Sequence, residues 1–195
     1  MLHSLQFPFS FDVNRLVADL DNVQPEDWIP HFNKGYYEGE WSVASLRAVG
    51  GKAHAIYPDP TSTDYADTEI LARCSYYREV LDFFQCPLTA VRLMKLKPGS
   101  EIREHRDHCL GYEDGEVRIH IPVTTNPYVE FFLEGQPMTM LPGESWYLNF
   151  NLWHRVANRG ETERVHLVLD CVMSPWLDNQ FRETMQKQLE NTTAE

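Results

Sequence analysis

Short β-rich runs separated by turn residues dominate the chain from residue 89 onward, and they constrain its fold more than any other feature. The runs are rich in Val, Ile, Leu, Phe and Tyr and lie at residues 89–97, 117–123, 128–133, 137–141, 145–150 and 164–172. Turn formers such as Pro98-Gly99, Asn126-Pro127 and Pro142-Gly143 separate them. Strands that recur about every ten residues between turns are typical of an all-β sandwich or barrel. The sequence therefore predicts a mainly β core over residues 89–173.

Helical patterns flank this core on both sides. Apolar residues at helical spacing predict one helix over residues 13–20 and another within residues 66–86. A third such pattern predicts a C-terminal helix over residues 174–190. We expect a single domain over residues 1–195, in which residues 1–88 supply helices and supporting strands.

The composition limits the possible partners. The 195-residue chain has a formal net charge of −12, so its surface repels phosphates and we expect no nucleic-acid partner. No apolar run approaches the roughly 18 residues of a membrane-spanning helix, so we expect no membrane association. The four cysteines lie far apart and form no C-x-x-C pair, which predicts reduced thiols in a cytoplasmic protein.

A possible metal site begins with the triplet His105-Arg106-Asp107. In an extended segment, residues i and i+2 point the same way, so one imidazole and one carboxylate can reach a single ion. His154 could add a third ligand from a neighbouring strand. Two histidines and one carboxylate are the ligands of non-haem Fe(II) oxygenases. The alternative is a solvated loop after Pro98-Gly99 with no metal role.

Two of the predicted strands carry an Arg-x-His pair on one face. Arg118 and His120 share a face of the run 117–123, and Arg164 and His166 share a face of the run 164–172. These faces could be exposed to solvent, or they could line one cavity of a closed sandwich. A guanidinium group in a cavity favours a planar anion that it can bind with two hydrogen bonds, such as a dicarboxylate.

Together, His105-x-Asp107, Arg118-x-His120, His154 and Arg164 resemble the aspartyl/asparaginyl β-hydroxylase family. The resemblance runs from about Trp41 to Pro175. The segment from His31-Phe32-Asn33 to Arg47 is also similar to bacterial free-proline cis-4-hydroxylases of that family. The resemblance implies a double-stranded β-helix (a cupin-like jelly roll) that binds Fe(II), 2-oxoglutarate and O₂.

The resemblance also implies a role for each matching residue. His105, Asp107 and His154 would bind Fe(II). Arg164 would pair with the distal carboxylate of 2-oxoglutarate, and His120 would contact this cosubstrate near the metal.

Three further positions complete the resemblance. Arg118 would hold a carboxylate of the cosubstrate or the substrate. Trp41 would form a wall of the pocket, although core packing is an equal alternative. Glu116 stands where members that hydroxylate acidic side chains tend to have an arginine, which argues against recognition of an aspartyl side chain.

These observations predict a 2-oxoglutarate-dependent hydroxylase acting on an amino acid, either free or in a peptide, with release of succinate and CO₂. An alternative is a non-catalytic cupin-like domain that binds a small carboxylate. A third hypothesis, a different cupin metal enzyme, is disfavoured because such an enzyme does not need the dicarboxylate anchors Arg118 and Arg164. The sequence predicts neither the oligomeric state nor the choice between hydroxylation and a variant outcome such as desaturation.

Overall fold

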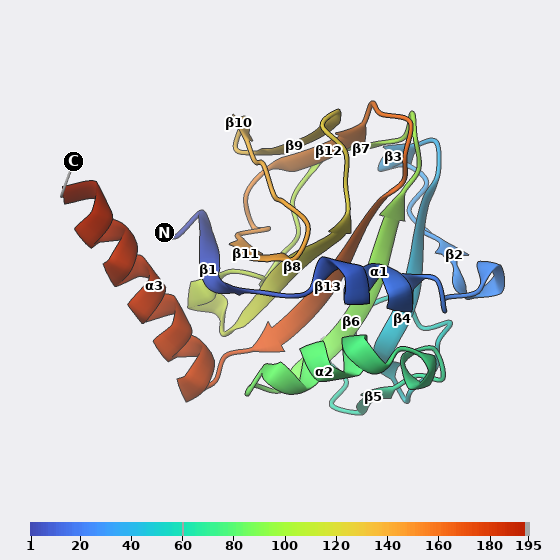
Figure 1. Ribbon diagram of the computed structural model, residues 1–195, viewed down its shortest axis with the longest axis horizontal. Coiled ribbons are helices and arrows are strands. Elements are labelled where there is room, and N and C mark those ends of the chain that lie inside the picture. The colour runs from blue at the N-terminus through green and yellow to red at the C-terminus, as the bar shows by residue number, and fades with distance from the viewer. Residues whose placement is uncertain (60, 194–195) are drawn as a thin grey trace.

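The computed structural model describes residues 1–59 and 61–193 and shows two antiparallel β-sheets that face each other (Figure 1). The larger sheet has the order β1-β11-β8-β13-β6-β4-β2, and β5 pairs with β4. The smaller sheet has the order β10-β9-β12-β7-β3. Two facing antiparallel sheets with helices near both ends of the chain confirm the predicted double-stranded β-helix.

The strands have the following bounds. Those of the larger sheet are β1 (Ser4–Ser10), β2 (Ile29–Pro30), β4 (Trp41–Val49), β5 (Tyr65–Asp67), β6 (Leu88–Leu96), β8 (Glu116–Thr124), β11 (Glu144–Leu148) and β13 (Arg164–Val172). Those of the smaller sheet are β3 (Tyr37–Glu38), β7 (Glu101–His105), β9 (Val129–Leu133), β10 (Gln136–Pro137) and β12 (His154–Asn158). The α-helices are α1 (Val13–Leu20), α2 (Ser75–Phe83) and α3 (Pro175–Thr193), with short 3₁₀ turns at Pro25–Asp27, Leu71–Arg73 and Tyr112–Asp114.

The central strand of the larger sheet, β13, is buried on both faces. Eight of its nine residues are buried, and its neighbour β8 is buried over seven consecutive residues. One face of these strands packs against helices, and the other faces the smaller sheet. This double burial explains why their sequences are almost continuously apolar instead of alternating, and why the few charged residues on them need partners inside the protein.

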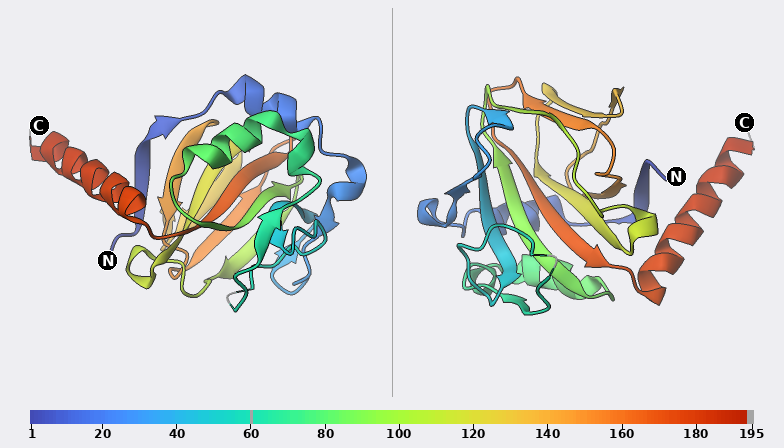
Figure 2. Two further views of the ribbon diagram at one scale, coloured as in Figure 1. Left: turned by 90° about the horizontal axis from the view of Figure 1, so that it is seen from below. Right: turned by 180° about the vertical axis from the view of Figure 1, so that it is seen from behind.

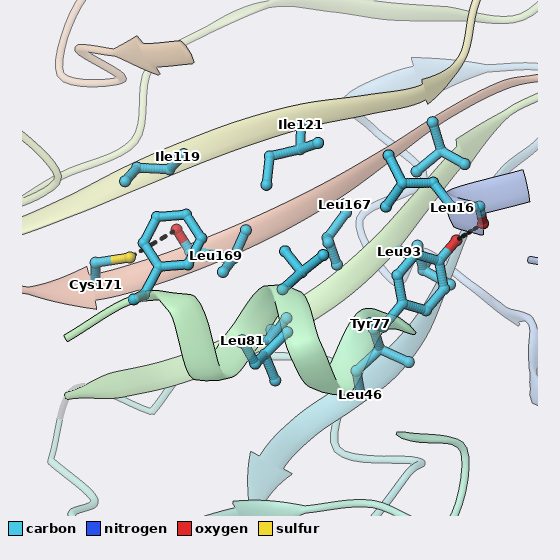
Figure 3. Packing of buried hydrophobic residues seen from close by; sticks show 14 of the residues in the cluster. Leu16, Leu46, Tyr77, Leu81, Leu93, Ile119, Ile121, Leu167, Leu169 and Cys171 are labelled. Carbon is cyan, nitrogen blue, oxygen red and sulfur yellow. Dashed lines mark hydrogen bonds between the residues drawn. The ribbon is translucent and has the colours of Figure 1, made fainter. Parts of the chain in front are cut away.

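The face of the larger sheet that points away from the smaller sheet is covered by α1 and α2. Figure 3 shows α2 lying across the strands, with Leu81 directed at the leucines and isoleucines of β6, β8 and β13. The Tyr77 hydroxyl donates a hydrogen bond of 2.9 Å to the Leu16 carbonyl and so joins the two helices. The buried Asp19 carboxylate accepts hydrogen bonds from the Tyr76 and Tyr77 amides in the first turn of α2. These contacts give the sheet a rigid backing.

Helix α3 leaves the body of the protein beside β1 and projects beyond it (Figures 1 and 2). Its first turns are anchored, because Leu177 and Phe181 are fully buried and the Phe181 ring packs against Phe7 and Tyr147. Further along the helix Leu189 is 69% exposed. Of the helices in the described residues, none is long and apolar enough to cross a membrane.

Most predicted elements are present. The helix over residues 13–20, the helix within 66–86 and the C-terminal helix all form, and five of the six β-rich runs correspond to β6, β8, β9, β11 and β13. The prediction of a strand over residues 137–141 was wrong, because β10 contains only Gln136 and Pro137. It is an edge strand, and a proline offers no N–H for a longer ladder.

Candidate active site

Three potential metal ligands converge where the smaller sheet faces the larger one. Strand β7 ends at His105 and β12 begins at His154, and these two residues are directly paired in the antiparallel ladder. Asp107 follows β7 by two residues, and its backbone amide donates a hydrogen bond of 2.8 Å to the Phe150 carbonyl. One potential ligand atom from each of His105, Asp107 and His154 lies within 4.8 Å of the others. This set of two imidazoles and one carboxylate suits a divalent transition metal such as Fe(II) and leaves coordination positions open.

Both imidazoles are oriented by backbone carbonyls. His105 Nδ1 lies 2.8 Å from the Arg103 carbonyl, and His154 Nδ1 lies 2.9 Å from the Leu152 carbonyl. A carbonyl only accepts hydrogen bonds, so each Nδ1 carries the proton and each Nε2 keeps a lone pair for a metal. Burial, and then the neighbouring His105, lowers the pKa of His154 to about 4, which keeps the His154 ring neutral and able to bind a cation.

The carboxylate of Asp107 is held from behind by Arg118. Arg118 Nη1 donates a hydrogen bond of 2.6 Å to Asp107 Oδ2. The same guanidinium donates from Nε and Nη2 to the two Asp170 oxygens, at 2.6 and 3.0 Å. Asp170 and Arg118 are direct partners in the β13–β8 ladder. Three of the five N–H groups of Arg118 are therefore taken by carboxylates of the protein itself.

The charges around Arg118 form a buried chain. Burial by itself lowers the pKa of Arg118, but the adjacent Asp170 and Asp107 outweigh this effect and raise it above its ordinary value. A second arginine, Arg92 on β6, donates from Nη2 to Asp170 Oδ2 at 2.6 Å. Two guanidinium groups thus share the fully buried carboxylate of Asp170. One of them, Arg118, is held in place by Asp170 and in turn holds Asp107.

Arg164 lies at the other end of the same sheet face and has different surroundings. Its side chain is buried, its Nη2 donates to His166 Nδ1 at 2.9 Å, and its Nε has no partner. Among the described residues no carboxylate forms an ion pair with it, and burial lowers its pKa to about 9. A buried guanidinium without a counter-charge is costly, so the site favours an anionic ligand.

His120 links Arg164 to the metal side of the cavity. Because His166 Nδ1 accepts from Arg164, the 3.2 Å contact between the Nδ1 atoms of His120 and His166 needs His120 as the donor. The Nε2 atom of His120 is buried and has no partner. The His120 ring stacks on Phe150 at 4.9 Å, and Phe150 in turn contacts the His154 ring at 4.6 Å.

These groups line one cavity of about 460 Å³, which is within the usual size range of small-molecule sites. Its floor carries Arg92, Arg118 and Arg164, and aromatic side chains form its walls. Six buried side-chain N or O atoms of the described residues lack a hydrogen-bond partner, and five of them belong to residues that line this cavity. The five are His31 Nδ1, Trp41 Nε1, Arg92 Nε, His120 Nε2 and Arg164 Nε. Buried polar atoms are normally paired, so their concentration here indicates a polar ligand site.

Trp41 has both of the roles that the sequence left open. Its side chain is buried in the inner core and also lines the cavity, where it stacks on His31 with ring centroids 3.6 Å apart. The cavity mouth is aromatic, because Phe32, Tyr36 and Tyr57 are all largely exposed there.

Two cavity residues, Arg92 and His31, were not among the predicted site residues. Arg92 interrupts the apolar run of β6 in the same way that Arg118 and Arg164 interrupt theirs, and this signal was available in the sequence. His31 lies outside the β-rich region, and only the fold brings its ring against Trp41. His166, which shares a strand face with Arg164, is buried and does not line the cavity.

Comparison with known proteins gives consistent matches. A family model described as "Aspartyl/Asparaginyl beta-hydroxylase" matches residues 10–174. A curated relative, L-proline cis-4-hydroxylase of Rhizobium meliloti (strain 1021), is 25% identical over 165 residues, which cover 82% of this chain and 57% of the relative. The chain thus spans little more than half the length of this relative.

Solved structures with the same fold include two bacterial oxygenases. One is a 2OG-Fe(II) oxygenase family oxidoreductase from Burkholderia pseudomallei, with a TM-score of 0.55 and 15% identity over 87% of this chain and 85% of that one. The other is a Pseudomonas putida prolyl-4-hydroxylase, with a TM-score of 0.54 and 14% identity over 88% of this chain and 92% of that one. At these identities the likeness establishes the shared fold.

Proposed function

The chain belongs to the aspartyl/asparaginyl β-hydroxylase family, and from this premise we propose that it is an Fe(II)- and 2-oxoglutarate-dependent dioxygenase. It would hydroxylate an unactivated C–H bond of an amino acid that is either free or within a peptide. The observation that carries the proposal is the convergence of His105, Asp107 and His154 in the cavity that also exposes the uncompensated guanidinium of Arg164.

In this proposal His105, Asp107 and His154 hold Fe(II). The two Nε2 atoms and one carboxylate oxygen provide the donor set, while Arg118 keeps the other Asp107 oxygen engaged. When bound, Fe(II) supplies the chemistry that uses O₂ to convert 2-oxoglutarate to succinate and CO₂ and to oxidise the substrate C–H bond. The protein supplies the position of the reactants and a site protected from water.

The cosubstrate would bind between the metal ligands and Arg164. The guanidinium of Arg164 offers an unused Nε–H and a positive charge to the distal carboxylate. Trp41 presents an unpartnered N–H to the same cavity, while His120, whose Nδ1 carries the proton, presents an Nε2 lone pair that accepts. The donors of Arg164 and Trp41 fit a linear dicarboxylate, because such a ligand supplies acceptors and negative charge at its far end.

The name of the matched relative supports an amino acid as the substrate. That protein is described as an L-proline cis-4-hydroxylase. The cavity of about 460 Å³ suits a small molecule or a single residue of a peptide. Glu116 at the start of β8 accepts a hydrogen bond of 2.7 Å from the Thr89 hydroxyl and is not among the residues that line this cavity.

A product screen tests the proposal. The purified protein is given Fe(II), ascorbate and 2-oxoglutarate together with free amino acids and short peptides. We expect succinate release that depends on one of these substrates and a product heavier by one oxygen atom in the mass spectrum. The proposal is wrong if the protein, with metal and 2-oxoglutarate bound, releases no succinate with any of these compounds.

A further inference from the structure

The floor of the cavity contains a second cation that the cosubstrate does not need. Arg92 on β6 is 5% exposed, lines the cavity, and has an Nε atom with no hydrogen-bond partner. Its only ion pair among the described residues is the 2.6 Å contact from Nη2 to Asp170. An Arg side chain that is almost fully buried and leaves a donor unused indicates a ligand with a matching acceptor.

Arg92 and Arg164 are held at different points of the cavity floor. Their guanidinium groups are anchored on β13 four residues apart, Arg164 on His166 and Arg92 on Asp170. In the proposed function the cosubstrate lies between the metal ligands and Arg164, so neither of its ends is assigned to Arg92. A second anion is therefore the ligand that Arg92 suits.

Arg118 is less suited to be the receptor of that second anion. Its guanidinium donates to Asp107 and twice to Asp170, so it is engaged on two sides by carboxylates of the protein. Arg92 shares Asp170 with Arg118 but uses one N–H for it. Of these two arginines, Arg92 has more unused donors, including a buried Nε, and it shares its one carboxylate partner with Arg118.

The charges on and behind the cavity floor favour an anionic group next to Arg92. Arg92, Arg118 and Arg164 contribute three positive charges there, and Asp107 and Asp170 contribute two negative ones. A bound dication and a 2-oxoglutarate dianion cancel each other and leave one positive charge. The α-carboxylate of an amino acid offsets this charge locally, while its ammonium group must lie away from the three arginines.

We propose that Arg92 binds the free α-carboxylate of the substrate, so that the enzyme acts on a free amino acid and not on a residue inside a peptide chain. This inference rests on the proposed function and selects one of its two substrate classes. The carboxylate lies on Arg92, and the apolar body of the substrate contacts the aromatic groups at the cavity mouth, among them Phe32 and Tyr57. A residue within a peptide has an amide in place of this carboxylate and would leave the Arg92 charge unpaired.

Matched acid and amide probes test this inference. The probes are the twenty common free L-amino acids, beginning with L-proline, and the corresponding α-carboxamides, beginning with L-prolinamide. The readout is substrate-dependent succinate release at saturating 2-oxoglutarate. We expect at least one free acid to be a substrate and its carboxamide to have a kcat/KM lower by about 10²-fold, since a buried guanidinium then loses its charged partner.

Two variants connect this preference to Arg92. Arg92→Met should lower kcat/KM for the acid by about 10²-fold and bring acid and amide to within roughly tenfold of each other. Arg92→Lys keeps the charge and should retain part of the preference. Binding of 2-oxoglutarate and Mn(II), measured by calorimetry, should be unchanged in both variants and shows that they fold. Arg182→Met, which changes an arginine on the exposed side of α3, is the matched control.

The remaining outcomes contradict either this inference or the proposed function. Equal turnover of acid and amide, or an acid preference that survives in Arg92→Met, contradicts the inference. So does an enzyme that binds metal and 2-oxoglutarate but accepts only peptide substrates or no free acid at all. Failure to bind metal and 2-oxoglutarate contradicts the proposed function itself, which is a different outcome.

Discussion

Arg118 Nη1 donates a 2.6 Å hydrogen bond to Asp107 Oδ2. The one carboxylate among the three candidate metal ligands is therefore held by a residue of the larger sheet. Arg118 is itself fixed by Asp170, its direct cross-strand partner. The candidate metal ligands are thus connected to the larger sheet through one side chain. Residues that hold a metal ligand in this way typically change metal affinity by 10- to 100-fold when they are altered.

The first prediction concerns Asp170. Asp170→Asn removes the negative charge shared by Arg92 and Arg118, so the Arg118 side chain loses its restraint and Asp107 is held less well. We expect Fe(II) affinity to fall by at least about tenfold. We also expect a loss of about 3–5 kcal/mol of unfolding free energy, because two buried guanidinium groups lose a counter-charge. Metal titration followed by calorimetry and urea unfolding measure the two effects.

The matched control for Asp170 is Asp67→Asn. Asp67 also accepts hydrogen bonds from two arginines, Arg47 and Arg78, but its side chain is 32% exposed. We expect this variant to change stability by about 1 kcal/mol or less per ion pair and to leave metal affinity unchanged. Equal metal affinity in the two variants would contradict the connection through Arg118.

The second prediction concerns Arg164. Arg164→Met removes the guanidinium that has no carboxylate partner, and should weaken 2-oxoglutarate binding by about 10²-fold while metal affinity stays the same. Equilibrium titration with 2-oxoglutarate in the presence of Mn(II) measures this. Arg155→Met is the control, because Arg155 stacks on Phe132 at 3.9 Å and is not among the residues that line the cavity. Unchanged 2-oxoglutarate affinity in Arg164→Met would show that the cosubstrate anchor lies elsewhere.

The third prediction concerns the pH dependence of stability. Burial, and then the charge of Arg164, keeps the pKa of His166 well below its ordinary value of 6.5. The folded protein therefore holds this ring neutral, whereas the unfolded chain takes up a proton below pH 6.5. The contribution of this neutral ring to the unfolding free energy should be complete above pH 6.5. It should decrease as the pH is lowered, by up to about 2 kcal/mol per histidine at pH 5.

Urea unfolding between pH 8 and pH 5 checks this dependence. His166→Asn is less stable at neutral pH but should show a smaller loss of stability on acidification than the wild type. His54→Asn, which changes an exposed histidine, should keep the wild-type slope. A slope that is the same in His166→Asn as in the wild type would rule out His166 as its source.

The fourth prediction concerns the backing of the large sheet. Tyr77→Phe removes the hydroxyl that donates to the Leu16 carbonyl and joins the two helices, which should cost about 0.5–1.5 kcal/mol. Because the helices lie on the opposite face of the sheet from the cavity, metal affinity should not change. Tyr128→Phe, at a residue that is 65% exposed, should have no effect on stability. Loss of metal binding in a folded Tyr77→Phe protein would contradict this separation of the two faces.

The sequence predicted the parts of the fold that depend on local pattern. The run 164–172 coincides with β13. Arg118 and Arg164 each interrupt an apolar strand, and of the two alternatives that this pattern left open, a solvent-exposed face or a shared cavity, the structure shows the cavity. Strands β7 and β12 were not predicted. Each has only five residues, and β7 (Glu101–His105) is mostly charged. Neither shows a strand pattern of its own, and each forms because adjacent strands in the fold pair with it.

The connections within the site could not be predicted, because they depend on register. Asp170 holds Arg118 only because β13 and β8 pair these two residues directly, and a shift of one residue would turn them to opposite faces. Arg92 on β6 is paired with Val168 and reaches Asp170, which lies two residues further along β13 on the same face. The sequence shows which residues are charged within apolar strands, but the pairing decides which of them are neutralised and which remain free to bind a ligand.

The most direct test of the account is anaerobic absorption spectroscopy of the protein with Fe(II) and 2-oxoglutarate. We expect a weak visible charge-transfer band in the wild type that needs both additions. The band should be absent in His105→Ala at any 2-oxoglutarate concentration, and in Arg164→Met it should appear only at a much higher one. A wild-type protein without the band, or a His105→Ala protein that keeps it, would contradict the claim that these residues form an iron and 2-oxoglutarate site.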